Sequence, residues 1–170
     1  MYMKNVLENY FNIKNKVFFI TGGSGLLGKE ICDVVLDFGG IPIIFDINEK
    51  KSLSYINHIN KKYSNPKILF IKGNVSNKID VQKAVSKVIK KFKKIDVLIN
   101  NAAIDSKVKN NKKNFSFFEK YSINDLNKEI DVGINGAVIC TQVIGSKMKR
   151  KKNGIIINIS SDLGVIAPDQ

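Results

Sequence analysis

The sequence predicts an α/β fold in which helices cover both faces of a doubly wound parallel sheet. Short apolar runs alternate along the chain with segments whose apolar residues recur at the helical period. The apolar runs are continuous, as is typical of parallel strands that are buried on both faces. Because consecutive parallel strands are joined by right-handed crossovers, this alternation favours one open sheet with helices on each side.

Each strand and helix has a local signal in the sequence. The predicted strands are Lys16–Thr21, Ile41–Asp46, Ile68–Lys72, Ile95–Asn100 and Gly154–Ile159. The predicted helices are Leu26–Phe38, Glu49–Tyr63, Asn77–Phe92 and Ser122–Arg150, and a polar loop is expected at Ala102–Tyr121. Gly39 and Gly40 are typical of a helix end, and Ser122 with Asp125 forms a capping-box-like start for the last helix.

Length and composition indicate one globular domain. The chain has 170 residues, of which 44% are hydrophobic and 25% are charged. Its net charge of +13 raises nucleic acid as a partner. The lysines are scattered, however, and the densest basic run, Lys147–Lys152, contains no aromatic residue that could stack on a base. We therefore expect a solvated basic surface and no nucleic acid partner.

Cysteine and histidine usage, together with hydropathy, argues against several other classes. Cys32 and Cys140 have no metal-binding or CxxC spacing, and we expect buried thiols in a reducing cytoplasm. His58 is the only histidine, so no histidine-rich metal cluster is expected and no metal is assigned. No apolar run reaches the roughly 20 residues of a membrane span, so no membrane partner is expected. Residues 1–15 lack the apolar core of a signal peptide.

The glycine-rich segment Thr21–Gly28 lies between the first predicted strand and the first predicted helix. In this context Gly22 permits a tight turn, Gly25 lets main-chain amides approach a pyrophosphate, and Gly28 lets the helix pack close to the strand. The positive end of the helix dipole then favours the phosphates. The turn is therefore predicted to bind a dinucleotide. Further cofactor contacts are expected from Ser24, Leu26 and Leu27.

Asp46 ends the second predicted strand, 18 residues after Gly28. An acid at this position accepts hydrogen bonds from the adenosine ribose hydroxyls and repels the extra phosphate of NADP. The sequence thus predicts an NAD-binding Rossmann fold, with Ile47 as a further cofactor contact. The alternative is a solvated aspartate at a strand end that binds no ligand.

Together these motifs resemble the short-chain dehydrogenase/reductase family, over the range Asn15–Gln170. Asn74 and Val75 resemble the family's Asp-Val pair that contacts adenine, with asparagine in place of aspartate. The segment Asn100–Ala103 resembles the family's Asn-Asn-Ala-Gly, which supports the sheet and lines the ribose side of the cofactor. The cofactor contacts that this resemblance implies are Asn101, Ala102 and Ala103.

Ser161 follows the fifth predicted strand, and the resemblance implies that it is the catalytic serine, which holds the substrate oxygen. Two residues depart from the family pattern. Leu26 stands where the short branch of the family has a glycine. Gly133 stands where many members have an asparagine that helps to hold a proton-relay water, and the nearby Asn135 is not assigned that role. A glycine inside a predicted helix indicates a packing or functional reason.

The family's Tyr-x-x-x-Lys does not follow Ser161 in this chain. In the family, the lysine lowers the pKa of the tyrosine, which then exchanges a proton with the substrate. We therefore expect a Rossmann domain that is truncated after its fifth strand. We also expect that residues 1–170 alone are inactive and that the outer strand edge is uncovered.

The implied function of the intact protein is NAD(H)-dependent oxidation or reduction of a small-molecule alcohol or ketone. A sugar derivative is one candidate substrate, because the chain resembles bacterial oxidoreductases of flagellin modification and surface-polysaccharide biosynthesis. A non-catalytic NAD-binding regulatory protein is the alternative. We also expect a homo-oligomer in which the last helix packs against its copy, unless the sheet covers the apolar face of that helix. That face consists of Ile123, Leu126, Ile130, Ile134, Val138 and Thr141.

Overall fold

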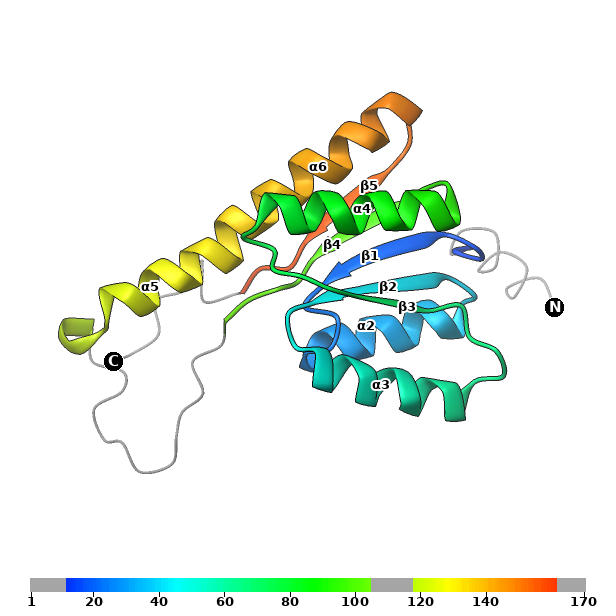
Figure 1. Ribbon diagram of the computed structural model, residues 1–170, viewed down its shortest axis with the longest axis horizontal. Helices are drawn as coiled ribbons and strands as arrows, with labels where there is room; N and C mark the ends of the chain where they lie inside the picture. The colour runs from blue at the N-terminus through cyan, green and yellow to red at the C-terminus, as the bar shows by residue number, and fades with distance from the viewer. Residues whose placement is uncertain (1–11, 105–117, 162–170) are drawn as a thin grey trace.

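The fold is a parallel sheet of five strands in the order β3-β2-β1-β4-β5 (Figure 1). The computed structural model describes residues 12–104 and 118–161. The strands are β1 (Val17–Thr21), β2 (Ile41–Asp46), β3 (Leu69–Lys72), β4 (Val97–Asn100) and β5 (Ile155–Asn158). β1 is central, and its Phe19 pairs with Ile43 on one side and Leu98 on the other. All three side chains are fully buried, which explains why these strands are continuous apolar runs.

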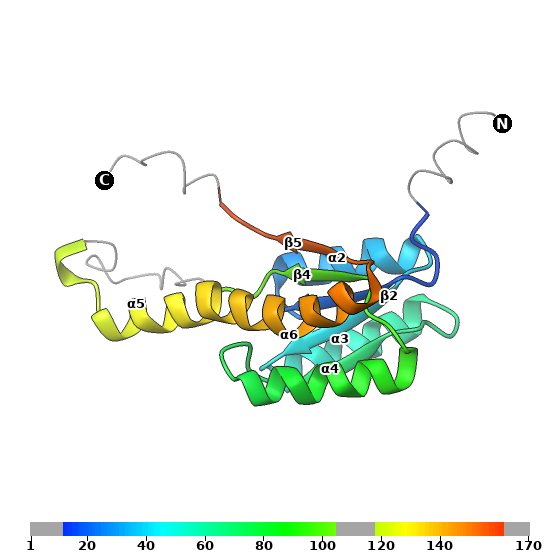
Figure 2. The same cartoon turned by 90° about the horizontal axis from the view of Figure 1, so that it is seen from above.

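Helices cover both faces of the sheet (Figure 2). They are α2 (Leu26–Asp37), α3 (Glu49–Lys62), α4 (Lys78–Phe92), α5 (Ile123–Ile130) and α6 (Gly136–Lys151), with a short 3-10 turn at Phe118–Lys120. α2 and α3 pack on one face through Cys32 and Ile59, whereas α4 and α6 pack on the other through Val85 and Ile144. The predicted doubly wound α/β architecture is confirmed. Within the described ranges, none of these helices is long and apolar enough to cross a membrane.

Side chains cap α3, α4 and α5 at the N-terminus, whereas α2 and α6 have no side-chain cap within the described residues. Asn48 and Asn77 each accept a main-chain hydrogen bond at the start of α3 and α4. Ser122 Oγ accepts one from the amide of Asp125 at 3.4 Å, in agreement with the predicted start of α5. α2 begins after Gly25 with no side-chain cap among the described residues and no acid in its first turn. The first amides of α2 therefore have no side-chain acceptor.

The last helix predicted from the sequence contains one wide turn. Residues Asp131–Asn135 form a π-helical turn between α5 and α6, in which the Gly136 amide donates to the Asp131 carbonyl. The same carbonyl accepts a hydrogen bond from Ser76 Oγ at 2.9 Å. A Cβ on Gly136 would lie 2.7 Å from Val75 Cγ2, so the helix lies tightly against the loop after β3. The wide turn therefore coincides with the two places where the helix contacts this loop, at Ser76 and at Val75.

α5 projects beyond the sheet, and the apolar face that runs from α5 into α6 is open to solvent (Figure 1). Ile123 is 67% exposed, Ile134 is 60% exposed and Val138 is 50% exposed. Leu126 and Ile130 are each 38% exposed. Thr141, the last residue of the predicted face, is half-buried and accepts a hydrogen bond from Asn100 Nδ2 at 3.2 Å. Of the two alternatives for this face, cover by the sheet is thus wrong for the other five residues within the described chain.

β5 forms one outer edge of the sheet, and all of its residues are exposed. Ile156 faces α6, because its Cδ1 lies 3.5 Å from the position of a Cβ on Gly145. Strand alternation turns Ile155 and Ile157 to the opposite face, where they are 59% and 42% exposed. The expected uncovered strand edge is therefore present in the described part of the chain.

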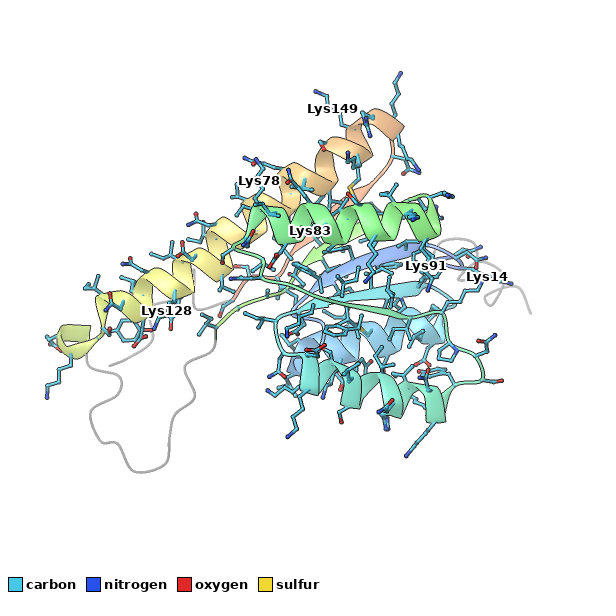
Figure 3. The ribbon with its side chains drawn as sticks, in the orientation of Figure 1. Lys14, Lys78, Lys83, Lys91, Lys128 and Lys149 are labelled. Atoms are coloured by element: carbon cyan, nitrogen blue, oxygen red, sulfur yellow. The ribbon has the colours of Figure 1, made fainter. Side chains whose placement is uncertain are left out.

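Six of the lysines that the structure describes are labelled in Figure 3: Lys14, Lys78, Lys83, Lys91, Lys128 and Lys149. The labelled side chains are all exposed and come from the segment before β1, from α4, from α5 and from α6.

Candidate cofactor-binding site

The residues predicted to bind a cofactor come from separate stretches of the sequence but meet at one edge of the sheet. Because the strands are parallel, the carboxyl ends of β1, β2, β4 and β5 share this edge, on the side from which α5 projects (Figure 1). The strand order reverses between β1 and β4. Open α/β sheets bind ligands at such a reversal point, beyond the carboxyl ends of the strands.

The glycine turn after β1 is compact for steric reasons. Gly22 has a φ of +63°, a conformation that favours glycine, and its amide donates to the Phe45 carbonyl at 2.9 Å. The Gly25 amide donates back to the Gly22 carbonyl at 2.9 Å. A Cβ on Gly28 would collide with that same carbonyl oxygen and would lie 2.7 Å from Gly23 Cα. The turn therefore has no room for a side chain at Gly28, and α2 lies directly against it.

Exposed apolar side chains lie in the first turn of α2 and after the carboxyl ends of β2 and β4. Leu26 is 85% exposed and Leu27 is 57% exposed, although both belong to the first turn of the helix. Ile47 after β2 is 66% exposed, and Ile104 after β4 is 44% exposed. Free amides at a helix N-terminus suit phosphates, and exposed apolar side chains beside them suit the flat rings of a nucleotide. The residues present thus fit a dinucleotide.

Asp46 is held in place by three hydrogen bonds. Its Oδ2 accepts from Ser24 Oγ at 2.6 Å and from the Ser24 amide at 3.0 Å. Its Oδ1 accepts from the Asn48 amide at 2.8 Å. Ser24 is only 3% exposed. The sequence indicated Ser24 as a direct cofactor contact, whereas the structure places its hydroxyl on the carboxylate of Asp46.

Asn101 joins the end of β4 to the glycine turn. Its Nδ2 donates to the carbonyls of Thr21 and Gly22, at 2.9 Å and 3.2 Å. Thr21 Oγ1 accepts in turn from the amides of Asn101 and Ala102, at 2.9 Å and 3.0 Å. Ala102 is half-buried beside Gly22, and Ala103 is exposed. Thr21 was not among the predicted site residues, although its place at the start of the glycine motif was a signal for it.

The loop after β3 lies next to the strand that carries Asp46. The Gly73 amide donates to the Asp46 carbonyl at 3.1 Å. Asn74 Oδ1 accepts from the amide of Ser76 at 3.0 Å, which forms a local turn. The side chain of Val75 is buried in the core. At Val75 it is therefore the main chain, rather than the side chain, that can contact a ligand.

Asn100 links the ends of β4, β5 and α6. Its Nδ2 donates to Asn158 Oδ1 at 2.8 Å and to Thr141 Oγ1 at 3.2 Å, and its Oδ1 is buried with no partner among the described residues. The Asn100 carbonyl accepts from the Ile159 amide at 2.9 Å, which keeps the chain beyond β5 beside β4. Ser161 lies just past this point and is exposed.

Gly133 lies in the π-helical turn. The sequence led us to expect that a larger side chain would be excluded there by packing or by function. A Cβ built on Gly133 would meet no heavy atom of the described chain within 4 Å. Asn135 bonds to Asp131, with 2.7 Å between Nδ2 and Oδ1. Neither residue contacts the glycine turn in any hydrogen bond of the described chain. Packing within the described chain thus gives no reason for glycine at this position.

The two cysteines are buried, as predicted, and they are unlike reactive thiols. Cys32 lies beneath the glycine turn, with its Sγ 3.8 Å from the Gly23 carbonyl oxygen. Burial, and secondarily the carboxylate of Asp33, raises the pKa of Cys32. Burial raises the pKa of Cys140 to about 12. Because the thiolate is the nucleophile, neither residue is suited to covalent catalysis.

Comparison with known proteins extends over almost the whole chain. Residues 16–169 match the family model described as short chain dehydrogenase. The chain is 27% identical over 156 residues to post-translational flagellin modification protein A of Campylobacter coli, which covers 92% of this chain and 59% of that protein. It is 26% identical over 165 residues to the NAD-dependent glycerol dehydrogenase of Listeria innocua, which covers 94% of this chain and 58% of that protein. The chain thus spans less than three fifths of the length of these relatives.

A solved structure shows the same arrangement. The crystal structure of a short chain dehydrogenase from Bacillus anthracis is 30% identical in sequence and superposes with a TM-score of 0.79, covering 90% of this chain and 60% of that chain. The family match takes in the glycine turn, the ends of all five strands and the long helix. On this match, which covers far more than half of the chain, the protein belongs to the short chain dehydrogenase family.

Proposed function

We propose that this protein is an oxidoreductase that binds NAD(H) at the carboxyl edge of its sheet. It transfers hydride between the nicotinamide and the alcohol or ketone carbon of a small-molecule substrate. The observation that carries the proposal is the fixed carboxylate of Asp46 beside the uncapped N-terminus of α2. The first suits ribose hydroxyls, and the second suits a pyrophosphate. Bound NAD supplies the hydride chemistry, and the chain binds and orients it.

Each predicted contact has a place in this proposal. Main-chain amides in the first turn of α2 hold the pyrophosphate, and exposed apolar side chains cover the rings of the cofactor. The loop after β3 lies on the adenine side, and the segment after β4 lies on the nicotinamide ribose side. The proposed cofactor contacts are Gly22, Gly25, Leu26, Leu27, Gly28, Asp46, Ile47, Asn74, Val75, Asn101, Ala102 and Ala103.

Ser161 is the residue that we propose to hold the substrate oxygen. It lies beyond β5 at the edge where the glycine turn and Asn101 meet, and it is exposed. A serine hydroxyl there can donate to a carbonyl oxygen or accept from an alcohol.

NAD rather than NADP is the proposed cofactor. Asp46 would repel a phosphate on the ribose, as its neighbour Glu49 would. Lys72, which pairs with Asp46 across β2 and β3, forms an ion pair with Glu49 at 2.8 Å. Its charge is thus partly neutralised and is less able to attract a phosphate. The NAD-dependent glycerol dehydrogenase among the relatives supports the same choice.

A hydroxyl-rich substrate fits the relatives best. One relative is named for glycerol and another for flagellin modification. We therefore propose a sugar derivative or other polyol that is oxidised or reduced at one carbon, in surface-glycan or flagellin modification. Buried, reduced cysteines are consistent with a cytoplasmic site for this reaction.

Fluorescence titration of the purified 170-residue chain with NADH and NADPH tests the binding proposal. We expect saturable binding of NADH and weaker binding of NADPH. Asp46→Ala should weaken NADH binding by about 10- to 150-fold, because one charge-assisted hydrogen bond contributes about 1.5–3 kcal/mol. It should also reduce the preference for NADH over NADPH. Absence of saturable binding by the unmodified chain would overturn the proposal.

A non-catalytic NAD-binding regulator is the second candidate, and Gly133 is the observation that favours it. The side chain that many family members place there is missing, and the space around its Cβ position is open. Tight binding of NADH by the purified protein without turnover of polyols or their ketones would support this candidate. Turnover of either class of compound would exclude it.

We also propose that the protein forms a homo-oligomer. The apolar face of α5 and α6 is exposed in the described chain, and such faces on soluble domains commonly mark contact surfaces. Analytical ultracentrifugation over a range of concentrations tests this, and a monomer at all concentrations would contradict it.

A further inference from the structure

Two hydrogen bonds join Ser24 to the carboxylate of Asp46. Ser24 is in the glycine turn after β1, and Asp46 ends the neighbouring strand β2. Two donors of Ser24, its hydroxyl and its amide, bond to the same oxygen, Asp46 Oδ2, at 2.6 Å and 3.0 Å. The Asn48 amide bonds to the other oxygen at 2.8 Å. We call Ser24, Asp46 and Asn48 the Asp46 clamp.

The three hydrogen bonds of the clamp leave one acceptor position of the Asp46 carboxylate open for a ligand. An ionised carboxylate offers about four lone-pair positions, and the clamp fills three of them. Both positions on Oδ2 are filled, so the remaining one is on Oδ1. A ribose hydroxyl can therefore bond to Asp46 through Oδ1 without displacing Ser24. Because both oxygens are tied, the carboxylate is oriented before the ribose arrives.

Burial decides what the Ser24 hydroxyl can contact. Ser24 is 3% exposed, whereas Leu26 and Leu27 in the same turn are more than half exposed. A ligand at the edge of the sheet would reach those side chains and Asp46 before it reached the Ser24 hydroxyl. The hydrogen bond from the Ser24 hydroxyl to the carboxylate is short and charge-assisted. Such bonds are about twice as strong as neutral ones, so a bond from the hydroxyl to a ligand would have to replace a strong interaction.

We propose that Ser24 is a positioning residue for cofactor selectivity, which acts through Asp46 and not by touching the cofactor. This inference rests on the proposed function. Ser24 ties the turn that holds the pyrophosphate to the strand end that holds the ribose. It thereby fixes both the orientation of the carboxylate and the spacing of the two subsites.

A double-mutant cycle tests the proposal. The dissociation constants of NADH and NADPH are measured by fluorescence for the unmodified chain, Ser24→Ala, Asp46→Ala and the double variant. Ser24→Ala keeps the amide bond but loses the hydroxyl bond, and we expect about three- to tenfold weaker NADH binding, with a smaller ratio of NADPH to NADH dissociation constants. In the Asp46→Ala background, the same substitution should change NADH binding less than twofold, because its target is gone.

Ser52→Ala is the matched control. Ser52 is fully buried nearby, and its hydroxyl donates to the Asn48 carbonyl at 2.8 Å rather than to a carboxylate. We expect it to leave the NADPH to NADH ratio unchanged. Circular dichroism and urea unfolding of each variant report whether the fold is retained.

The outcomes separate this inference from the proposed function. If the unmodified chain binds neither cofactor, the proposed function fails and the inference fails with it. If the chain binds NADH, three results overturn the inference alone. Ser24→Ala could tighten NADH binding, which would mean that Ser24 competes with the ribose. It could weaken binding equally in the Asp46→Ala background, which would mean direct contact. It could also leave the selectivity ratio unchanged.

Discussion

At the scale of single residues, the glycine turn makes the sharpest steric demand in the molecule. A Cβ on Gly28 would meet main-chain atoms of Gly22 and Gly23, which cannot rotate away as a side chain can. We expect Gly28→Ala to lower the free energy of unfolding by about 2–3 kcal/mol, as overpacking of a filled site does. Urea denaturation followed by circular dichroism measures this, and an unchanged midpoint would contradict it.

Substitution of Gly133 by alanine should change the free energy of unfolding in the opposite direction. A Cβ there would meet no heavy atom within 4 Å, and the φ of Gly133 is not positive. Alanine in a helical segment has less backbone entropy to lose on folding than glycine, so we expect Gly133→Ala to stabilise the chain by up to about 1 kcal/mol. A lower midpoint in urea for Gly133→Ala would show that the π-helical turn itself needs glycine.

The cysteines give a prediction that depends on pH. Burial raises the pKa of Cys140 to about 12, and it also raises the pKa of Cys32, so both thiols are protonated at pH 8. We expect neither to react with a thiol reagent such as DTNB at pH 8 in the folded chain, whereas both react in denaturant. Rapid modification of one thiol in the folded chain would contradict this.

The direction of the linked stability change follows from the same shifts. The unfolded chain releases these protons near the ordinary thiol pKa of 9.0, and the folded chain holds them to higher pH. The folded state therefore binds more protons above pH 9, and the contribution of both thiols to stability is lost as the pH rises. Below pH 8 this contribution is constant.

At the scale of secondary structure, the parts that could be predicted are those with local signals. The strands are continuous apolar runs, and the conformation of the glycine turn is determined by a few residues that are adjacent in the sequence. Contacts between distant segments could not be predicted in this way. The Ser24 hydroxyl meets a carboxylate 22 residues further along the chain. Ser76 meets the Asp131 carbonyl 55 residues away, at the turn that departs from a regular helix.

The packing of α6 on the loop after β3 is a testable contact of this kind. A Cβ on Gly136 would lie 2.7 Å from Val75 Cγ2, and Val75 is stiff and 7% exposed. We expect Gly136→Ala to destabilise the chain by about 1–3 kcal/mol. Val75→Ala should relieve part of this, so the double variant should lose less stability than the sum of the single variants. Strict additivity in urea unfolding would mean that the two residues do not touch.

At the scale of the whole molecule, two separate apolar surfaces are exposed in the described chain. One is the face of β5 that carries Ile155 and Ile157, and the other runs along α5 and α6 through Ile134. An exposed edge strand with isoleucines can pair with another chain through both its main chain and its side chains. We therefore expect the 170-residue chain to associate as its concentration rises.

Two lysine substitutions distinguish these surfaces. Ile157→Lys places a charge on the uncovered side of an edge strand, which is how natural sheets prevent such pairing. If β5 is the contact, sedimentation velocity should show less association for Ile157→Lys, while Ile134→Lys associates like the unmodified chain. If the helical face is the contact, the two variants should exchange these results. Ile156→Lys is the control for a change in folding, because Ile156 faces α6 and its charge would destabilise the chain instead. No association of the unmodified chain at any concentration would mean that neither apolar surface is a contact in this chain.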